Sequence, residues 1–366
     1  RRSGTRAPGR LRVVSACLCA LRLCIHVCVY MPSALLAAAA ATSSQAVTNV
    51  THGRSLVAHD ISRAGTFCLG GKLVPLTFLL GCQRCGSNSL YEDIVGSIRG
   101  ARSGHALRGE PDYYAREQHF YATDSWSRGM GFYADHFPEC PGRNAHPQYQ
   151  FTVDATPAYL RKPIVADRLQ ATLPGAAQPL LKFVVILRDP ALRLYAYWDA
   201  FVLSGTGVKN FDNWLKVTMD AVRECQRNHG DDLWPPPDTF HCDEDTIEGV
   251  AAGVYHAQLE YWFKRFGPKR FLLTSTDAYE EDTQRVVKDV SHFLTGSAEL
   301  ASPARHPSNI DSIKVFGGMS SDARTKLGRF YQPHNSKLLH LLTHQTQVTF
   351  SPSVKQLGVQ GWIAGG

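Results

Sequence analysis

The stretch Leu73-Val-Pro-Leu-Thr-Phe-Leu-Leu-Gly-Cys-Gln-Arg-Cys-Gly-Ser-Asn-Ser-Leu90 decides the fold. Its first eight residues form a short apolar run, which is typical of a buried parallel strand. A glycine turn over residues 81–86 follows, and residues 87–94 predict a helix, with Ser89 and Glu92 at the spacing of a capping box and acidic residues in its first turn. A strand, a glycine turn and a helix in this order predict a P-loop-like turn in an α/β fold.

Further strands and helices alternate along the chain. Strands are predicted at residues 151–154, 182–187 and 271–274, and amphipathic helices at residues 247–266 and 282–294. Pro75 limits the first half of the first strand, since proline cannot donate to a sheet. Strands that alternate with helices imply right-handed crossovers. We therefore expect a three-layer α/β fold, with a mostly parallel central sheet and helices on both faces.

Length and composition set the domain organisation. The chain has 366 residues, of which 44% are hydrophobic, enough for one large α/β domain. We expect a leader at residues 1–45, a polar stem at 46–71, a catalytic domain at 72–350 and a tail at 351–366. The formal charge is +7, but six of the positive charges are arginines in the first 22 residues. The remainder is mildly basic, which suits an anionic ligand and argues against a nucleic-acid partner.

The leader predicts entry into the secretory pathway. Residues 23–41 carry no formal charge and are long enough to cross a bilayer core of about 30 Å after a basic opening. A single-pass signal anchor with a luminal catalytic domain and a cleaved signal peptide both fit. Asn49-Val50-Thr51 is a glycosylation sequon. In an oxidising lumen Cys225 and Cys242 are candidates for a disulfide, although sequence cannot prove that pairing.

The glycine turn has the composition of an anion site. Such a turn directs backbone N–H groups and the positive end of a helix at one point. Arg84 adds a full charge, and Ser87, Asn88 and Ser89 add donors. It is not a Walker A loop, because no lysine follows Gly86. An ordinary glycine turn remains an alternative, as does a redox pair formed by the Cys82-x-x-Cys85 motif.

Two further segments carry candidate chemistry. Arg188-Asp189-Pro190 ends the strongest strand, where a guanidinium can hold a second phosphate; a structural Arg–Asp salt bridge is the alternative. In Arg116-Glu117-Gln118-His119, a glutamate and a histidine two residues apart point the same way on an extended segment. That pair suits general-base work on a hydroxyl.

Taken in order, these segments resemble the PAPS-dependent carbohydrate sulfotransferases, where PAPS is 3′-phosphoadenosine-5′-phosphosulfate. The resemblance is strongest to the heparan sulfate and N-acetylgalactosamine 4-sulfate 6-O branch, and it covers roughly residues 72–345. The segments that carry it, besides those quoted above, are Gly131-Phe-Tyr-Ala-Asp-His-Phe-Pro138, Asp154-Ala-Thr-Pro-Ala-Tyr-Leu160, Leu187-Arg-Asp-Pro-Ala-Leu-Arg-Leu-Tyr-Ala-Tyr197, Tyr255-His-Ala-Gln-Leu259 and Leu327-Gly-Arg-Phe-Tyr-Gln-Pro-His-Asn335.

The resemblance assigns roles to single residues. Glu117 takes the position of the catalytic base, with His119 beside it, and Arg84 stands where the family usually has a lysine that contacts the transferring group. Arg188 would hold the 3′-phosphate, and Ala196 replaces a serine that usually helps it. The cofactor loop would be completed by the residues that follow Arg84, namely Cys85, Gly86, Ser87, Asn88 and Ser89.

The function implied is transfer of a sulfuryl group from PAPS to a carbohydrate hydroxyl by in-line displacement, without a metal. The acceptor would be an anionic polysaccharide that meets loops at residues 101–150 and 204–245. The resemblance also implies a type II Golgi membrane protein, with secretion after cleavage as the alternative. A non-catalytic relative that binds PAP (the desulfated donor) or glycan, and a P-loop-type nucleotide kinase, remain rival functions.

Overall fold

The computed structural model describes residues 66–141, 149–205, 207–230, 234, 244–305, 318–352 and 357–364. The predicted leader, the sequon at Asn49 and the predicted disulfide partner Cys242 lie outside these residues. Within the described ranges, no helix is both long and apolar enough to cross a membrane.

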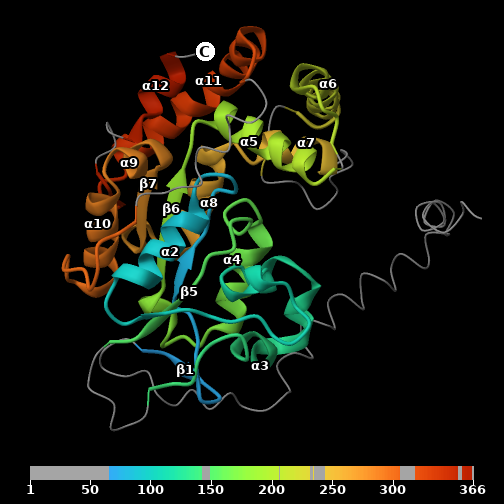
Figure 1. Ribbon diagram of the computed structural model, residues 1–366. Helices are drawn as coiled ribbons and strands as arrows, with labels where there is room; N and C mark the ends of the chain where they lie inside the picture. The colour runs from blue at the N-terminus through green and yellow to red at the C-terminus, as the bar shows by residue number, and fades with distance from the viewer. Residues whose placement is uncertain are drawn as a thin grey trace, which may run out of the picture. The chain divides into compact units, whose positions relative to one another are not determined.

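A six-stranded parallel sheet forms the centre of the fold (Figure 1). Its strands lie in the order β4 (Ala101–Arg102), β5 (Phe151–Asp154), β3 (Thr77–Leu79), β6 (Lys182–Leu187), β7 (Phe271–Ser275) and β8 (Thr349–Phe350). Every pairing between neighbours is parallel. Residues 183–187 of β6 are almost fully buried, as expected for a strand covered on both faces. The predicted α/β fold is confirmed.

The order of the strands explains how helices cover both faces. The chain moves from β3 toward β4 through helix α2 (Ser87–Ser97), and in the opposite direction from β6 toward β7 through helix α8 (Tyr255–Phe266). Right-handed crossovers in opposite directions place their helices on opposite faces. Accordingly α2 packs against α10 (Thr283–Thr295), while α8 packs against α4 (Pro163–Thr172) and α11 (Ser321–His344). The remaining helices are α3 (Gly129–Ala134), α5 (Pro190–Leu203), α6 (Phe211–His229), α7 (Glu244–Ala251), α9 (Thr276–Glu281) and α12 (Val359–Ala364).

The first predicted strand is divided in the structure. Residues 77–79 join the central sheet, whereas β2 (Lys72–Leu73) pairs antiparallel with β1 (Cys68–Leu69). Pro75 lies between the two parts and cannot donate a ladder hydrogen bond, so one continuous strand is disfavoured. The strands predicted at residues 151–154 and 182–187 are confirmed with the same bounds.

The prediction of one helix over residues 247–266 is wrong. Helix α7 ends at Ala251, and α8 begins at Tyr255. Gly253 lies in the break, and a Cβ atom there would come within 2.7 Å of the Tyr331 ring. The close approach of α11 therefore requires a glycine in the break. A periodicity taken from one segment alone does not contain that contact.

The described fold extends beyond residues 72 and 350, the limits expected for the catalytic domain. At the N-terminal side Phe67 is buried, and a disulfide joins Cys68 to Cys140. At the C-terminal side Trp362 of α12 is buried, and its carbonyl accepts a hydrogen bond from Asn335 Nδ2 of α11 at 3.4 Å. Cys225 is also disulfide-bonded.

Candidate active site

A cavity of about 280 Å³ opens beyond the carboxyl ends of β3 and β6. Ligands of open α/β sheets bind at this edge, outside the ends of the strands. The cavity is lined by Gln83, Arg84, Gly86, Ser87, Asn88, Ser89, Glu92, Glu117, Pro157, Arg188 and Ala196. The fold therefore brings the predicted cofactor loop, the strand-end arginine and the candidate base to one place. Of the predicted site residues, Cys85 and His119 do not line the cavity.

The cofactor loop ends in a helix that has no side-chain cap. Helix α2 begins at Ser87 with Gly86 as its N-cap, and no side chain caps it. The predicted capping box at Ser89 and Glu92 is wrong, as are the acidic residues of the first turn, because the helix starts two residues before Ser89. The first N–H groups of a helix lack intrahelical partners, and its N-terminus attracts anions. An anion in the cavity can supply the missing cap.

Gly81 is required by the turn that opens this loop. Its φ is 118°, and a Cβ atom would come within 2.3 Å of the Pro157 carbonyl oxygen. We expect Gly81→Ala to lower the free energy of unfolding by roughly 2–4 kcal/mol, because the backbone must shift. Gly96→Ala in α2 is the matched control: it meets no atom within 4 Å and should be neutral or stabilising. Denaturant unfolding of both variants measures this, and equal stabilities would contradict the requirement.

Buried Arg188 and half-buried Arg84 meet at the loop. Arg188, which follows β6 and is 8% exposed, donates from Nη1 to the Arg84 carbonyl at 3.1 Å. Arg84 donates from Nε to the Ala196 carbonyl at 3.1 Å. Burial lowers the pKa of both guanidinium groups, while the charges of Asp199 and Glu117 raise that of Arg84. Two partly desolvated cations next to a helix N-terminus form a strong site for phosphate or sulfate groups.

The alternative of a structural Arg188–Asp189 salt bridge is wrong. Asp189 forms its ion pair with Arg324 of α11, at 2.6 Å, and its other oxygen caps α5 by accepting from the Ala191 N–H at 2.8 Å. The Arg188 side chain is left to line the cavity. The partner of Asp189 comes from a distant helix, and this contact settles a question that the local sequence left open.

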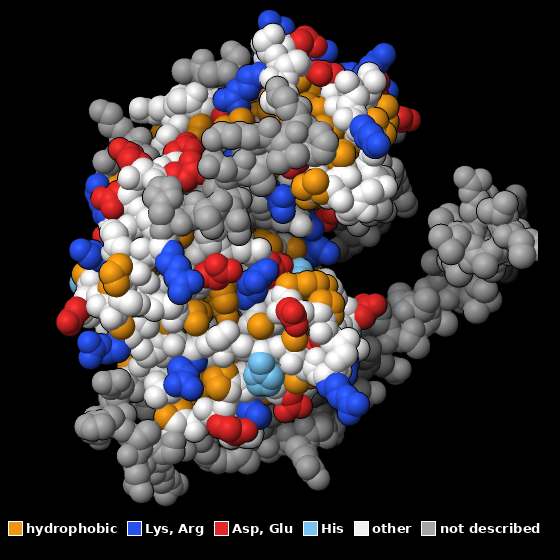
Figure 2. All heavy atoms as spheres, in the orientation of Figure 1, with side chains coloured by type: hydrophobic (Ala, Val, Ile, Leu, Met, Phe, Trp, Pro, Cys, Tyr) orange, Lys and Arg blue, Asp and Glu red, His pale blue; other side chains and the backbone are white. Residues whose placement is uncertain are grey.

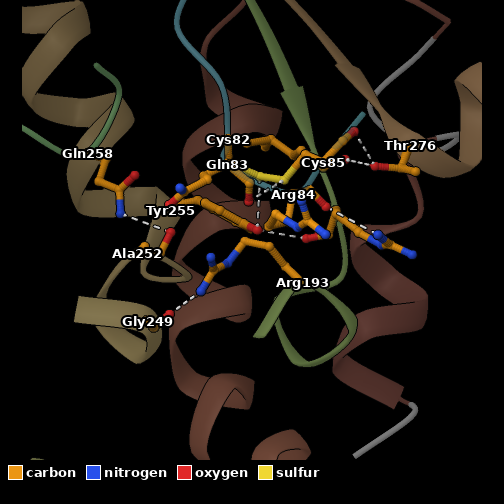
Figure 3. Close-up of a disulfide and its surroundings, with 12 residues drawn as sticks. Cys82, Gln83, Arg84, Cys85, Arg193, Gly249, Ala252, Tyr255, Gln258 and Thr276 are labelled. Atoms are coloured by element: carbon orange, nitrogen blue, oxygen red, sulfur yellow. Dashed lines mark hydrogen bonds between the residues drawn. A yellow bond between two sulfur atoms is a disulfide. The ribbon is translucent and has the colours of Figure 1, made fainter. Parts of the chain in front are cut away.

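Side chains of two helices bond to the backbone around the loop, and Figure 3 labels two of them, Tyr255 and Thr276. The Tyr255 hydroxyl donates to the Arg188 carbonyl at 2.9 Å and lies 3.3 Å from Cys82 Sγ. The Thr276 hydroxyl donates to the Cys85 carbonyl at 2.8 Å. Helices α8 and α9 thereby attach the loop to the end of the sheet, and ligand contacts made by the loop are preorganised.

Glu117 lies on the other side of the loop, in a segment held by β5. Its carboxylate is 3.4 Å from His119 Nε2. The His119 N–H donates to the Thr156 hydroxyl at 3.0 Å, and that hydroxyl donates to buried Asp154 at 2.6 Å. The expectation of an extended segment is wrong, because two 3-10 turns, Asp112–Ala115 and Phe120–Ala122, flank the pair and His119 has a φ of 51°. The two side chains still meet, but only Glu117 lines the cavity.

Asp199 is a residue that the sequence analysis missed. It is 1% exposed, and neither carboxylate oxygen has a hydrogen-bond partner within the described structure. Burial raises its pKa, and the charge of Arg84 lowers it. Asp199 lies one helical turn after Ala196 in α5, so helical spacing places both on the face toward Arg84. That spacing was a signal available in the sequence. The cavity residues Gln83, Glu92 and Pro157 were also missed.

The family of the chain follows from a comparison with known proteins. A model described as "Sulfotransferase domain" matches residues 75–316. The chain belongs to the sulfotransferase family. The match covers the loop, Glu117 and Arg188, so the cavity lies inside the family domain. This assignment replaces the nucleotide-kinase alternative.

Similar proteins include two curated sulfotransferases and one solved structure. Human carbohydrate sulfotransferase 15 is 21% identical over 208 residues, which cover 54% of this chain and 34% of that protein. Mouse bifunctional heparan sulfate N-deacetylase/N-sulfotransferase 4 is 20% identical over 299 residues, which cover 74% of this chain and 30% of that protein. This sulfotransferase therefore spans about a third of the length of these relatives. A sulfotransferase structure from Alicyclobacillus acidocaldarius shares the fold, with a TM-score of 0.53, 19% identity and coverage of 74% of this chain and 96% of that one.

The residues around the cavity fit a donor with two anionic ends. The lining includes the uncapped N-terminus of α2 and the side chains of Arg84 and Arg188. The lining is mainly polar and carries two permanent cations, which matches a phosphosulfate and a separate phosphate. Among the described residues no group of three or more His, Cys, Asp or Glu side chains is arranged to hold a metal ion.

One expected change in donor affinity follows from Ala196. Ala196 lines the cavity, and in the role that the resemblance gives this position a hydroxyl would add one donor for the 3′-phosphate. Ala196→Ser should therefore tighten PAP binding about fivefold, which is about 1 kcal/mol. Ala200→Ser, one turn further along α5, is the matched control and should bind PAP as the parent does. Calorimetric titration of PAP measures both, and an unchanged affinity in Ala196→Ser would show that the 3′-phosphate does not reach this turn.

Proposed function

We propose that this sulfotransferase transfers the sulfuryl group of PAPS to a hydroxyl of a carbohydrate, with Glu117 as the general base. The observation that carries the proposal is the placement of Glu117, Arg84 and the uncapped N-terminus of α2 around one cavity. A base, a cation and a row of backbone donors are the groups that an in-line sulfuryl transfer needs.

Each group has a defined task in this proposal. Glu117 accepts the proton of the acceptor hydroxyl as the acceptor oxygen forms its bond to sulfur. The N–H groups at the start of α2 and the Arg84 guanidinium stabilise the charge that develops on the departing 5′-phosphate oxygen. Arg188 holds the 3′-phosphate, and His119 restrains the Glu117 carboxylate through their 3.4 Å contact.

The carbohydrate acceptor is supported by the relatives. Carbohydrate sulfotransferase 15 and the heparan sulfate N-sulfotransferase are named for glycan substrates. On the face of the molecule drawn in Figure 2, basic and acidic side chains are interspersed, which does not resemble the basic stripe of a nucleic-acid binder. We propose an anionic polysaccharide as the acceptor.

The cellular location is part of the same proposal. An apolar run at residues 23–41 after a basic segment suits a type II anchor in the Golgi membrane, or a signal peptide removed on secretion. The Cys68–Cys140 disulfide suits an oxidising compartment, as the lumen would be. Fractionation of expressing cells with a protease-protection assay distinguishes a luminal domain from secreted enzyme.

The test is transfer of labelled sulfate from PAPS by the full chain to a panel of acceptors. The panel holds desulfated glycosaminoglycans, N-deacetylated forms with free amines, and simple alcohols and phenols. We expect label on glycan hydroxyl groups. Transfer to phenols alone would overturn the carbohydrate acceptor, and transfer to amines alone would overturn O-sulfation. PAP binding without transfer to any acceptor would favour the non-catalytic relative, for which the alanine at position 196 is the supporting observation.

A further inference from the structure

The cofactor loop contains a disulfide that the proposed reaction does not use. It joins Cys82 to Cys85 and encloses Gln83 and Arg84, both of which line the cavity. Figure 3 shows the sulfur–sulfur bond beside Arg84 and Tyr255. The bond thus closes a short ring around Arg84, the residue that in the proposed function stabilises charge on the departing 5′-phosphate oxygen.

Both cysteines are buried behind the cavity. Cys82 is 3% exposed and Cys85 is 0% exposed, and neither lines the cavity wall. The Cys82 N–H donates to the Ile186 carbonyl at 2.7 Å, and the Thr276 hydroxyl donates to the Cys85 carbonyl at 2.8 Å. The disulfide therefore connects two backbone positions that are themselves fixed to the end of the sheet.

A chain of contacts connects the disulfide to Arg188 and Arg84, the two arginines of the cavity lining. Cys82 Sγ is 3.3 Å from the Tyr255 hydroxyl, which donates to the Arg188 carbonyl. Arg188 in turn donates to the Arg84 carbonyl, between the two cysteines. A change at the sulfur atoms can alter the placement of both guanidinium groups.

Arg84 shows why the loop needs this restraint. Its φ is 68°, a left-handed conformation that is unfavourable for a residue with a Cβ atom. An open four-residue loop has more freedom to return Arg84 to a negative φ, and the side chain would then leave its place in the cavity lining. The ring closed by the disulfide reduces that freedom, as a cross-link does in a flexible segment.

We propose that the Cys82–Cys85 disulfide positions Arg84 for donor binding and makes the affinity for PAPS depend on the redox state of this pair. The proposal rests on the proposed function, because it assigns regulation to the same cavity. Its redox partner is a dithiol. Two electrons and two protons pass from the dithiol to the sulfur–sulfur bond, which breaks into two thiols, and the dithiol becomes a disulfide.

Bound PAP and a reductant should have opposite effects on the Cys82–Cys85 disulfide. If the closed loop binds PAP better than the open loop, bound PAP must favour the closed form by the same factor. PAP is therefore expected to slow the appearance of free thiols at Cys82 and Cys85. Because both sulfur atoms are buried, exchange requires the loop to open first.

The experiment measures PAP affinity of the full chain by calorimetry before and after treatment with dithiothreitol, with peptide mapping of free thiols. We expect PAP binding to weaken about tenfold once Cys82 and Cys85 are reduced, and to recover on reoxidation. The factor corresponds to the free energy that the open loop must spend to bring Arg84 into its left-handed conformation. A Cys68→Ser/Cys140→Ser variant is the matched control, and it should keep the reductant-dependent change. A Cys82→Ser/Cys85→Ser variant should bind PAP as weakly as the reduced enzyme does, and its affinity should not change with dithiothreitol.

Each other outcome is decisive. Unchanged PAP affinity with both thiols mapped as free overturns the proposal, as does a Cys82→Ser/Cys85→Ser variant that binds PAP like the oxidised parent. A bond that stays closed in dithiothreitol without PAP overturns the redox dependence. Oxidised enzyme that binds no PAP overturns the proposed function as well. Tight PAP binding by the oxidised enzyme that weakens only on reduction supports both the proposed function and the redox dependence. The Michaelis constant for PAPS should rise on reduction, while the Michaelis constant for the acceptor stays the same.

Discussion

Replacing Glu117 with glutamine should leave PAP affinity within about twofold and slow sulfuryl transfer by about 10²–10⁴-fold, the range for loss of a general base. Glutamine keeps the shape of the side chain but cannot accept the proton of the acceptor hydroxyl. Glu117 faces the cavity near Arg84 and contacts His119, so the variant preserves the local packing. Single-turnover transfer at saturating PAPS, together with PAP calorimetry, separates the chemical step from binding.

The matched control for this prediction is Glu299→Gln. Glu299 is exposed and lies outside the cavity lining, so its transfer rate should equal that of the parent. A Glu117→Gln variant that transfers sulfate at the parental rate would remove Glu117 from the role of base. A variant that loses PAP binding would instead assign the residue to the structure of the loop.

Replacing Arg188 with alanine should weaken PAP binding by about 10–150-fold, since a hydrogen-bonded charge contributes roughly 1.5–3 kcal/mol. The loss should depend on the 3′-phosphate, which this guanidinium is proposed to hold. Adenosine 5′-phosphate lacks that group, so its affinity should fall far less. Titration of both ligands into both proteins gives the interaction between residue and phosphate as a double difference.

Arg285→Ala, an exposed arginine on α10, is the control for general charge effects and should bind PAP normally. Equal losses for PAP and adenosine 5′-phosphate in Arg188→Ala would mean that the residue acts through the loop, where it donates to the Arg84 carbonyl. An unchanged PAP affinity would place the 3′-phosphate elsewhere.

The strands that carry the site were predictable because their signal is local. The β-branched run of β6 is buried on both faces, and its bounds agree with the prediction. The loop between residues 81 and 86 was also recognisable, since a strand, glycines and a helix follow in order. Because β3 and β6 are parallel neighbours in the sheet, the residues that follow them, Arg84 and Arg188, must lie at the same edge.

The remaining features depend on contacts between distant segments. The approach of Tyr331 requires the glycine at position 253. The ion pair of Asp189 with Arg324 shows that Asp189 is not the salt-bridge partner of Arg188. The Cys82-x-x-Cys85 motif indicates a redox pair as one alternative, but only the fold shows that the two cysteines form a disulfide and lie behind the cavity. A single sequence without a structure does not contain these distances.

The most direct test of the central claim is a crystal structure of the enzyme with PAP. The account predicts the 5′-phosphate within hydrogen-bond distance of the N–H groups at the start of α2, and the 3′-phosphate on the Arg188 guanidinium. Glu117 should remain open to the acceptor side of the cavity. PAP bound away from the carboxyl ends of β3 and β6, or with its 3′-phosphate distant from Arg188, would contradict the account.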